Sequence, residues 1–401
     1  MAGCSERDRA NPFDPRNHET RGAPVGFVAL AGDGRVDLSW QVVQGQGLVG
    51  YQLYRRTAGQ TTFEPLSSLL SPTTSRYYDL GLLNGLDHSY RLYYVFDTGL
   101  GGHPAEDTAT PGQVKPWVID EELGTLSRLT PDGRHVAFVR SGFVGPTGVG
   151  VDSASGQVWV SDGFGRRLTV LDPASGKTVD LPGLLALPST LAVNSIDHSA
   201  WICDEVGDAV YQFSPSLTPI LLPLQGIQTP IGVAVDPRDG SVWICERGAS
   251  RVRRYGASHD LRWRVAVDRP SRIAVDSFTG KGWTTSFENG QVVRITDAGS
   301  VDDTFPGFAG PIGLAVDPRR GRIWVADARA NQVVILDRGG SVVFRTGGVP
   351  EVHDLAVDLE SGEAWAVAPG SGEVVRLSPT GQVLRRLRGF EAPYGVAVDP
   401  D

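Results

Sequence analysis

The chain has 401 residues, of which 40% are hydrophobic and 21% charged, a globular composition that excludes wholesale disorder. Acidic residues exceed basic ones by nine, which argues against a nucleic-acid binder, and no apolar run reaches the 18 residues of a membrane-spanning helix. Three cysteines are too few for a disulfide framework, and the many glycines (50) and prolines (27) predict an all-β chain of short strands and tight turns.

The first segment, residues 1–22, is polar and rich in Pro, Asn and Arg, which predicts a flexible tether. Residues 1–5, MAGCS, resemble the end of a bacterial lipoprotein signal, where a small-small-Cys triplet is cleaved before the cysteine. The resemblance implies lipidation of Cys4, a translation start upstream, and a bacterial cell-envelope location, lipid-anchored, periplasmic or extracellular. If the triplet is an accident, a cytoplasmic location is the alternative.

Residues 23–112 form a second predicted domain. Alternating apolar and polar side chains in residues 35–40 and 50–56 indicate half-buried strands. The segment resembles a fibronectin type III domain, with Trp40 as its core tryptophan and Tyr90 as its tyrosine-corner residue. The resemblance implies a β-sandwich that serves as a spacer or a binding module, and nothing in it points to catalysis.

A repeat of about 41 residues fills the rest of the chain, residues 113–401. Seven of the nine tryptophans occupy one position of this repeat: Trp117, Trp159, Trp201, Trp243, Trp283, Trp324 and Trp365. Seven segments of one pattern begin 40 to 42 residues apart, namely PTGVGVD, PSTLAVN, PIGVAVD, PSRIAVD, PIGLAVD, VHDLAVD and PYGVAVD. Each unit holds four short strands separated by turns such as Asp-Pro-x-x-Gly, in which the aspartate accepts backbone hydrogen bonds. Such a radial repeat predicts a β-propeller.

The two ends of the repeat region complete each other. Residues 116–120 already match the second strand of a unit, whereas residues 393–399 form a lone opening strand. We therefore expect seven blades, one of them built from three strands of residues 116–145 and closed by the C-terminal strand. Closure removes the exposed edges that an open array would leave.

The unit P-x-G-V-A-V-D…G-x-V-W-V-x-D resembles the NHL repeat over residues 115–401. The sixth copy departs from the pattern, because residues 352–354, Val-His-Asp, replace Pro-x-Gly, and the fourth and sixth copies lose the acid after the Trp strand. The resemblance implies a fold and no particular ligand, because NHL proteins bind partners of quite different kinds.

Candidate ligand-binding residues gather at the end of the predicted channel where the first strands begin. Arg272, His353, Asp354 and Tyr394 replace the Gly, Ser or Thr of most copies, and their charged, imidazole and phenol groups suit a polar ligand. Acids at the ends of the second strands add to this face: Asp162, Asp204, Glu246 and Asp327. Two structural alternatives stay open, in which each acid caps its own turn or pairs with a neighbouring blade, and Arg272 pairs with Asp354 across the channel.

Cys203 and Cys245 lie two residues after the repeat tryptophan in adjacent units. Other copies have Ser161, Thr285 or Ala326 at this position, so the position requires a small side chain. The pattern predicts two buried free thiols rather than a disulfide or a metal site.

Two functions follow from these patterns. The first is a monomeric, non-catalytic envelope protein whose propeller face recognises a protein or glycan, with no nucleic-acid ligand and with membrane contact only through Cys4. The alternative is a propeller lyase or lactonase with a divergent site at the channel mouth. Streptogramin lyases resemble such propellers with two histidines and a glutamate, whereas here only His353 lies on the expected face. The sequence assigns no catalytic residue, metal ligand or cofactor. Ca²⁺ in the propeller channel is the one cofactor alternative left open, and Asp354 by itself does not provide a complete set of ligands.

Overall fold

The computed structural model describes residues 11–399 and divides the chain into two compact units. Unit 1 consists of residues up to 113 together with 130–135, and unit 2 of residues 114–129 and all residues from 136 onward. Apart from the short 3-10 helices Ala328–Ala330 and Pro369–Ser371, regular structure in the described range consists of strands. None of its helices is long and apolar enough to cross a membrane. The predicted all-β class is confirmed.

Unit 1 contains two antiparallel sheets. The first has the order β1-β2-β5, with bounds Val28–Gly32, Arg35–Ser39 and Arg76–Leu80. The second has the order β4-β3-β6-β7, with β8 also paired to β6, and bounds Glu64–Pro65, Leu48–Thr57, His88–Phe96, Gly99–Leu100 and, for β8, Ala105–Ala109.

Apolar side chains from both sheets form one core in unit 1. Trp40 lies in this core with 4% of its surface exposed, as predicted. The Tyr90 hydroxyl donates to the Asp79 carboxylate at 2.9 Å, and Arg55 donates to the same carboxylate at 2.8 Å. This contact differs from the predicted tyrosine corner, in which the hydroxyl bonds to the backbone. Burial and the Asp79 charge raise the pKa of Tyr90, so its hydroxyl stays a donor.

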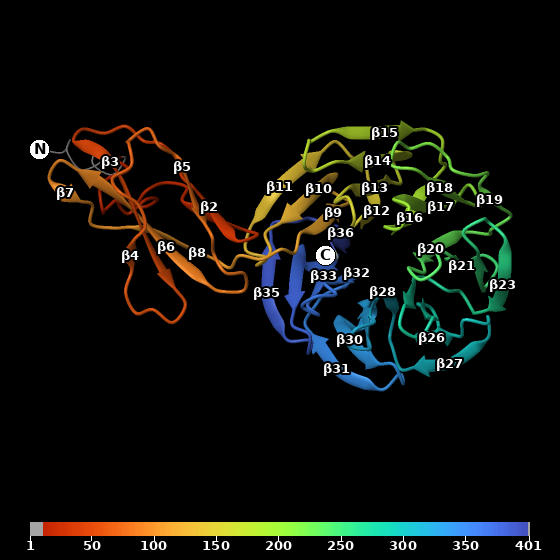
Figure 1. Ribbon diagram of the computed structural model, residues 1–401. Coiled ribbons are helices and arrows are strands. Elements are labelled where there is room, and N and C mark those ends of the chain that lie inside the picture. Colours follow the sequence, from red (N-terminus) through yellow and green to blue (C-terminus); the bar gives the residue numbers. More distant parts are fainter. Residues whose placement is uncertain (1–10, 400–401) are drawn as a thin grey trace, which may run out of the picture. The chain divides into compact units, whose positions relative to one another are not determined.

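Unit 2 is a ring of seven four-stranded antiparallel sheets, or blades, as Figure 1 shows. Blade 1 has β36 (Pro393–Val398), β9 (Pro116–Asp120), β10 (Thr125–Leu129) and β11 (Val136–Ser141). Blade 2 has β12 (Pro146–Val151), β13 (Val158–Asp162), β14 (Arg167–Leu171) and β15 (Thr178–Pro182). Blade 3 has β16 (Pro188–Asn194), β17 (Ser199–Asp204), β18 (Ala209–Phe213) and β19 (Leu224–Gln225).

The remaining blades follow in chain order, from the innermost strand outward. Blade 4 has β20 (Pro230–Val235), β21 (Val242–Glu246), β22 (Arg251–Tyr255) and β23 (Leu261–Ala266). Blade 5 has β24 (Ile273–Asp276), β25 (Lys281–Ser286), β26 (Gln291–Ile295) and β27 (Val301–Pro306). Blade 6 has β28 (Pro311–Asp317), β29 (Arg322–Asp327), β30 (Gln332–Asp337) and β31 (Val342–Gly347). Blade 7 has β32 (Asp354–Val357), β33 (Ala364–Ala368), β34 (Glu373–Leu377) and β35 (Val383–Arg388).

The predicted closure of the ring is confirmed. Strand β36 pairs antiparallel with β9, so that Val396 lies opposite Val118 and Ala397 opposite Trp117. The repeat tryptophans are at most 2% exposed and belong to cores shared by neighbouring blades. Trp324 of blade 6, for example, shares a core cluster with Leu355 of blade 7. The ring is therefore held together by apolar contacts between blades as well as by the β36–β9 ladder.

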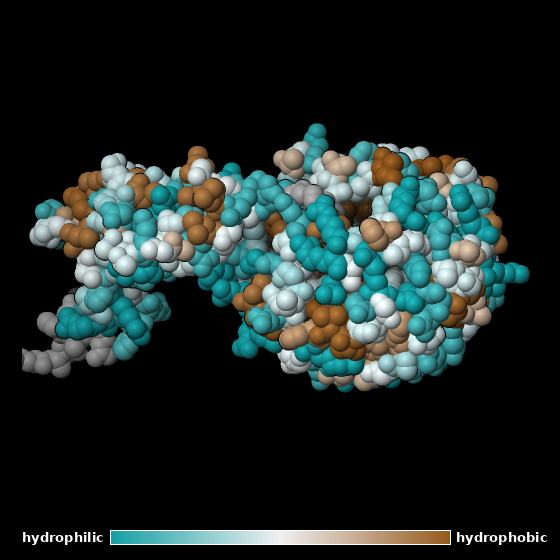
Figure 2. Space-filling view, turned by 60° about the horizontal axis from the view of Figure 1, so that its bottom comes forward, coloured by the Kyte–Doolittle hydropathy of each residue, from teal (hydrophilic) through white to brown (hydrophobic). Residues whose placement is uncertain are grey.

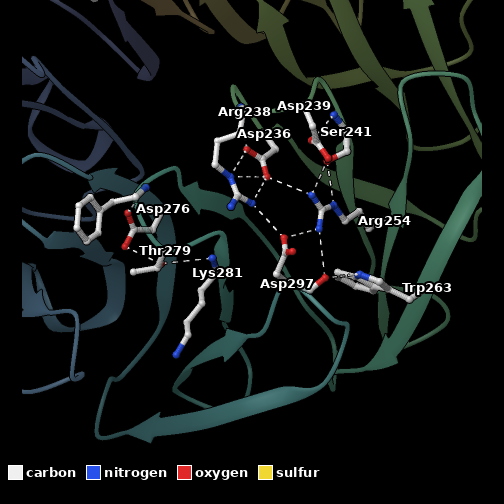
Figure 3. A network of polar contacts seen from close by, with 11 residues as sticks. Asp236, Arg238, Asp239, Ser241, Arg254, Trp263, Asp276, Thr279, Lys281 and Asp297 are labelled. Carbon is white, nitrogen blue, oxygen red and sulfur yellow. Dashed lines mark hydrogen bonds and ion pairs between the residues drawn. The ribbon is translucent and has the colours of Figure 1, made fainter.

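Opposite the end where the first strands begin, a polar network joins blades 4 and 5 (Figure 3). The guanidinium of Arg254, 5% exposed, donates to the carboxylates of Asp236 (3.2 Å), Asp239 (3.1 Å) and Asp297 (2.6 Å). Arg238 donates to Asp236 at 2.6 Å and to Asp297 at 3.0 Å. Asp236 also accepts the Arg238 backbone N–H, which is the turn role predicted for the Asp-Pro-x-x-Gly aspartates.

Apolar side chains of the outermost strands remain partly exposed, including Val343 (46%) and Leu384 (44%). On the face of the molecule in Figure 2, hydrophobic surface occurs as separate patches among hydrophilic side chains. Scattered exposed apolar residues are normal for globular proteins, so these strands alone indicate no binding surface.

Candidate ligand-binding site

A cavity of about 340 Å³ lies where the first strands of the propeller begin, at the mouth of the central channel. Its polar walls come from different blades: Glu121 from blade 1, Glu205 from blade 3, Arg247 from blade 4, and Arg269 from the connection between blades 4 and 5. Rings from Phe164, Phe287, His353 and Tyr394 complete the walls, and Arg272 lies at the base. We call this space the mouth cavity.

Arg272 stands directly before β24, at a position where most blades have Gly or Thr. Its backbone is fixed, because its N–H donates to Thr285 Oγ1 at 3.1 Å and its carbonyl accepts from Thr284 Oγ1 at 2.7 Å. Its guanidinium forms no hydrogen bond or ion pair with any residue from 11 to 399. Arg272 also lines a narrower space of about 140 Å³ further along the channel. A fixed backbone therefore presents an unpaired cation at the junction of the two spaces.

His353 and Tyr394 lie beside each other in the wall of the mouth cavity, with ring centroids 3.9 Å apart. His353 Nδ1 donates to the Tyr394 carbonyl oxygen at 2.7 Å. Burial and the nearby Arg272 charge lower the pKa of His353 to about 4, so the ring is neutral at pH 7. Since Nδ1 carries the proton, Nε2 is an acceptor, and it has no protein partner within the described part of the chain.

Burial raises the pKa of the Tyr394 phenol, which therefore stays protonated and can donate a hydrogen bond. Asp354 lines the narrower space rather than the mouth cavity. Burial raises the pKa of its carboxyl, while the Arg272 charge and the Val396 backbone N–H (3.3 Å) act in the opposite direction. No ion pair joins Arg272 to Asp354 in the described residues, so the predicted alternative of a plug across the channel is absent from this structure.

The four acids expected at this face are buried, with at most 2% of their surface exposed, and none lines the mouth cavity. Each accepts backbone N–H groups from the segment that enters its own blade. The donors include Gly145 for Asp162, Leu187 for Asp204, Gln228 for Glu246 and Gly310 for Asp327, at 2.7 to 3.1 Å. These contacts correspond to the structural alternative stated above, because the carboxylates hold the turns of their own blades.

In two of these four blades, the residue that follows the acid contributes to the cavity wall. Glu205 follows Asp204 and Arg247 follows Glu246, and both line the cavity. The equivalent positions of blades 1 and 5, Glu121 and Phe287, line it too. Our sequence interpretation placed Arg247 on this face but missed Glu121, Glu205 and Phe287, together with Phe164 and Arg269. An alignment of the repeats could have identified them. The acid at the end of the second strand recurs in most blades, whereas the residue after it differs from blade to blade, which is typical of a ligand-binding position rather than a structural one.

Charge in the mouth cavity is distributed unevenly. The side chains of Arg247, Arg269 and Arg272 make no ion pairs with residues 11–399, and all three come from blades 4 and 5 or their connection. Glu288 is partly neutralised by Arg329 at 3.7 Å, and burial together with two neighbouring acids raises the pKa of Glu121. Glu205, in the wall from blade 3, also makes no ion pair with the described residues, so the positive charge is confined to the sector formed by the three arginines. That sector can bind an anionic group of a larger ligand.

No group of three His, Cys, Asp or Glu side chains that could hold a metal ion occurs in residues 11–399. Cys203 and Cys245 are buried free thiols, as predicted. Burial raises the pKa of each to about 12, so neither is a thiolate at neutral pH. Cys4, the predicted lipidation site, lies outside the described residues.

Comparisons with known proteins agree with this fold. The family model described as NHL repeat matches residues 308–336, within blade 6. A streptogramin B lyase structure superposes with a TM-score of 0.56 at 18% identity, covering 63% of this chain and 86% of that chain. Virginiamycin B lyase from Staphylococcus aureus gives 0.55 at 18% identity, covering 64% and 92%. A protein of unknown function from Desulfotomaculum acetoxidans gives 0.62 at 16% identity, covering 71% and 98%.

Among curated proteins, an amylopullulanase from Thermoanaerobacterium saccharolyticum is 32% identical over 116 residues. The match covers 27% of this chain and 9% of that enzyme, so the chain spans only a small part of its length. The structural similarities lie below 25% identity and concern the fold alone. Together these findings identify the larger unit as a β-propeller that carries an NHL repeat.

Proposed function

We propose that the protein is a non-catalytic recognition module of the bacterial cell envelope, whose propeller binds an anionic group of a protein or glycan partner in the mouth cavity. The observation that carries this proposal is the unpaired guanidinium of Arg272 on a fixed backbone. An arginine at this position has no role in closing a blade, since five of the six other blades have glycine or threonine there. A free guanidinium in a cavity is a ready partner for a carboxylate or phosphate.

The other groups of the cavity extend this recognition. Arg247 and Arg269 add positive charge on the same side, whereas the Tyr394 hydroxyl can donate and His353 Nε2 can accept. Phe164, 62% exposed, supplies a flat apolar surface at the rim. These groups suit a polar ligand with one anionic end and a less polar body.

The remaining parts of the proposal concern location. In this proposal the chain is a monomer held at the membrane by a lipid on Cys4, with a fibronectin type III-like domain between the N-terminal segment and the propeller. The MAGCS sequence supports this arrangement. The predicted tether of residues 1–22 is not flexible along its whole length, because the Phe13 ring packs on Tyr94 and Phe96 of unit 1 and Asn17 is buried. A Cys4→Ser variant expressed behind a lipoprotein signal peptide should lose the detergent partitioning that the unmodified chain shows behind the same peptide, and equal membrane association of both forms would contradict the anchor.

The test of the binding site compares the full chain with Arg272→Gln on arrays of acidic glycans, neutral glycans and peptides. We expect at least one anionic probe to bind the unmodified protein and to lose about tenfold or more in affinity with Arg272→Gln, as loss of a charge-assisted contact implies. Arg264→Gln, an exposed arginine on the outer strand β23, is the matched control. Equal binding by both variants would refute the assignment.

A propeller lyase or lactonase remains the second candidate, and a neutral His353 with a free Nε2 is the observation in its favour. A base whose conjugate acid has a pKa near 4 is weak at neutral pH, and no second histidine lines the cavity. We therefore expect no turnover of a streptogramin B or of a sugar lactone. Turnover that is lost in His353→Gln would replace the recognition proposal.

A further inference from the structure

The outer face of the larger sheet in unit 1 carries a group of rings and cations that the core does not require. In β3 and β6, side chains alternate, so Leu53 and Leu92 are fully buried in the core. The alternate positions place Tyr54 and Arg56 of β3 and Arg91 and Tyr93 of β6 on the opposite, outer face. Phe63, from the loop between β3 and β4, lies over the same face.

These side chains are ordered against one another. The Tyr54 and Tyr93 rings meet edge to face with centroids 5.5 Å apart. The Phe63 ring lies between two guanidinium groups, with Arg91 at 4.0 Å and Arg56 at 4.8 Å from its centroid. Together with two threonines and Leu100 they line a cavity of about 540 Å³. We call the surface made by Tyr54, Arg56, Phe63, Arg91 and Tyr93 the aromatic face.

Several polar groups of the aromatic face lack partners within residues 11–399. The hydroxyls of Tyr54 and Tyr93 form no hydrogen bond there. Arg91 pairs with Glu106 at 2.7 Å, but Arg56 has no carboxylate partner among these residues, and its guanidinium lies over the Phe63 ring. The surface thus combines three preordered rings, free hydroxyl donors and one uncompensated positive charge.

We propose that the aromatic face binds an acidic oligosaccharide. The C–H faces of sugar rings pack on aromatic rings, and sugar hydroxyls match the free phenol and threonine hydroxyls. Arg56 would then pair with a carboxylate of the sugar. A peptide strand would instead add to a sheet edge, where backbone hydrogen bonds are available, and the rings here lie on a sheet face. The excess of nine acidic residues disfavours a nucleic acid, which aromatic rings and arginine could also accept.

This site is distinct from the mouth cavity, since all of its residues belong to unit 1. Substitutions can therefore abolish binding at one of the two sites without affecting the other. Arg272→Gln should leave oligosaccharide binding at the aromatic face unchanged, and substitutions in the aromatic face should leave the mouth cavity unchanged.

The experiment uses isothermal titration of the full chain with oligomers of galacturonic acid and, as the neutral probe, glucose oligomers of equal length. We expect the acidic oligomer to bind and Tyr93→Ala to weaken binding by about tenfold, while Tyr93→Phe, which keeps the ring, loses less. Arg56→Gln should reduce the affinity for the acidic oligomer to that of the neutral one. Tyr78→Ala and Arg76→Gln, exposed positions of β5 in the other sheet, are matched controls without effect.

We expect the melting temperature of each variant to match that of the unmodified chain, because the substituted side chains lie outside the core. Three results would overturn the proposal: no binding of either oligomer, equal loss in Tyr93→Ala and Tyr78→Ala, or equal binding of acidic and neutral oligomers with no effect of Arg56→Gln. Tighter binding of a single-stranded oligonucleotide than of the acidic sugar would assign the face to nucleic acid instead.

Discussion

The two ends of the propeller use arginine in opposite ways. At the end shown in Figure 3, Arg238 and Arg254 are enclosed by three aspartates, so their charges are neutralised within the protein. At the mouth, Arg247, Arg269 and Arg272 face a cavity and form no ion pairs with the described residues. Buried charges need partners to be tolerated, whereas unpaired charges are available to a ligand. The comparison shows arginine charge neutralised within the protein at one end and left available to a ligand at the other.

The largest expected effect comes from breaking the ring on which both ends depend. A chain that stops before residue 393 lacks β36 and exposes the β9 edge together with apolar surfaces on both sides of a gap. We expect an insoluble or strongly destabilised protein, measured by soluble yield and thermal unfolding. Removal of residues 1–10 only, which keeps the Phe13 ring on the core of unit 1, is the control and should change little. An unchanged melting temperature after the C-terminal deletion would contradict the closure.

The second largest expected effect is a loss of stability when the ion-pair network around Arg254 is broken. Arg254→Leu removes the shared donor of three carboxylates and leaves the fully buried Asp236 with Arg238 alone. We expect a loss of about 3 kcal/mol in the free energy of unfolding, as for other broken buried ion pairs. The exposed pair of Arg262 and Asp260 supplies the control, because Arg262→Ala should cost less than about 0.5 kcal/mol. If urea unfolding shows that Arg254→Leu and Arg262→Ala lower the free energy of unfolding by similar amounts, the buried network does not contribute more to stability than the exposed pair.

A pH dependence sharpens the comparison at the mouth. The pKa of His353 is about 4 in the folded protein and 6.5 in its ordinary state, so the unfolded chain binds the proton more readily. Its contribution to stability is complete above pH 6.5 and is lost as the pH falls toward 4. His353→Gln keeps a donor for the Tyr394 carbonyl but does not titrate. Between pH 7 and pH 5, this variant should lose about 2 kcal/mol less stability than the unmodified chain.

Urea unfolding at the two pH values measures this difference, and the carboxyl groups shared by both proteins cancel. An equal loss of stability in both would show that His353 is not held neutral by its surroundings.

The smallest effect on stability belongs to Arg272. Arg272→Ala removes an unpaired side chain, so the free energy of unfolding should change by less than about 1 kcal/mol. Binding of the anionic partner should nevertheless be lost, which separates a recognition residue from a structural one. A stability loss like that of Arg254→Leu, with binding intact, would place Arg272 among the structural arginines.

The repeat made most of the propeller predictable from sequence. Tryptophans spaced by about 41 residues fixed the number of blades, and the incomplete units at 116–120 and 393–399 indicated how the ring closes. Arg272, His353 and Tyr394 could be singled out because they interrupt an otherwise regular pattern. All three line the mouth cavity, although their role as ligand-binding residues stays a prediction.

The acids were harder to interpret from sequence. The Asp162 carboxylate accepts a hydrogen bond from the backbone N–H of Gly145, which lies 17 residues earlier in the chain. Every residue except proline has a backbone N–H, so the identity of the partner residue gives no clue. An acid that holds a turn and an acid that binds a ligand therefore look alike in the sequence. The aromatic face was missed for a related reason, because Tyr54 and Phe63 approach Arg91 only after β3 and β6 pair.

The closing ladder also has a consequence for synthesis on the ribosome. Asp120 accepts hydrogen bonds from Glu391 and Ala392, which follow it by 271 and 272 residues. At elongation rates of about 5 to 20 residues per second, the β9 edge waits roughly 15 to 50 seconds for its partner strand. During that interval the nascent chain presents an open edge to other nascent chains and to chaperones. Synthesis and pairing of β36 thus end this vulnerable period.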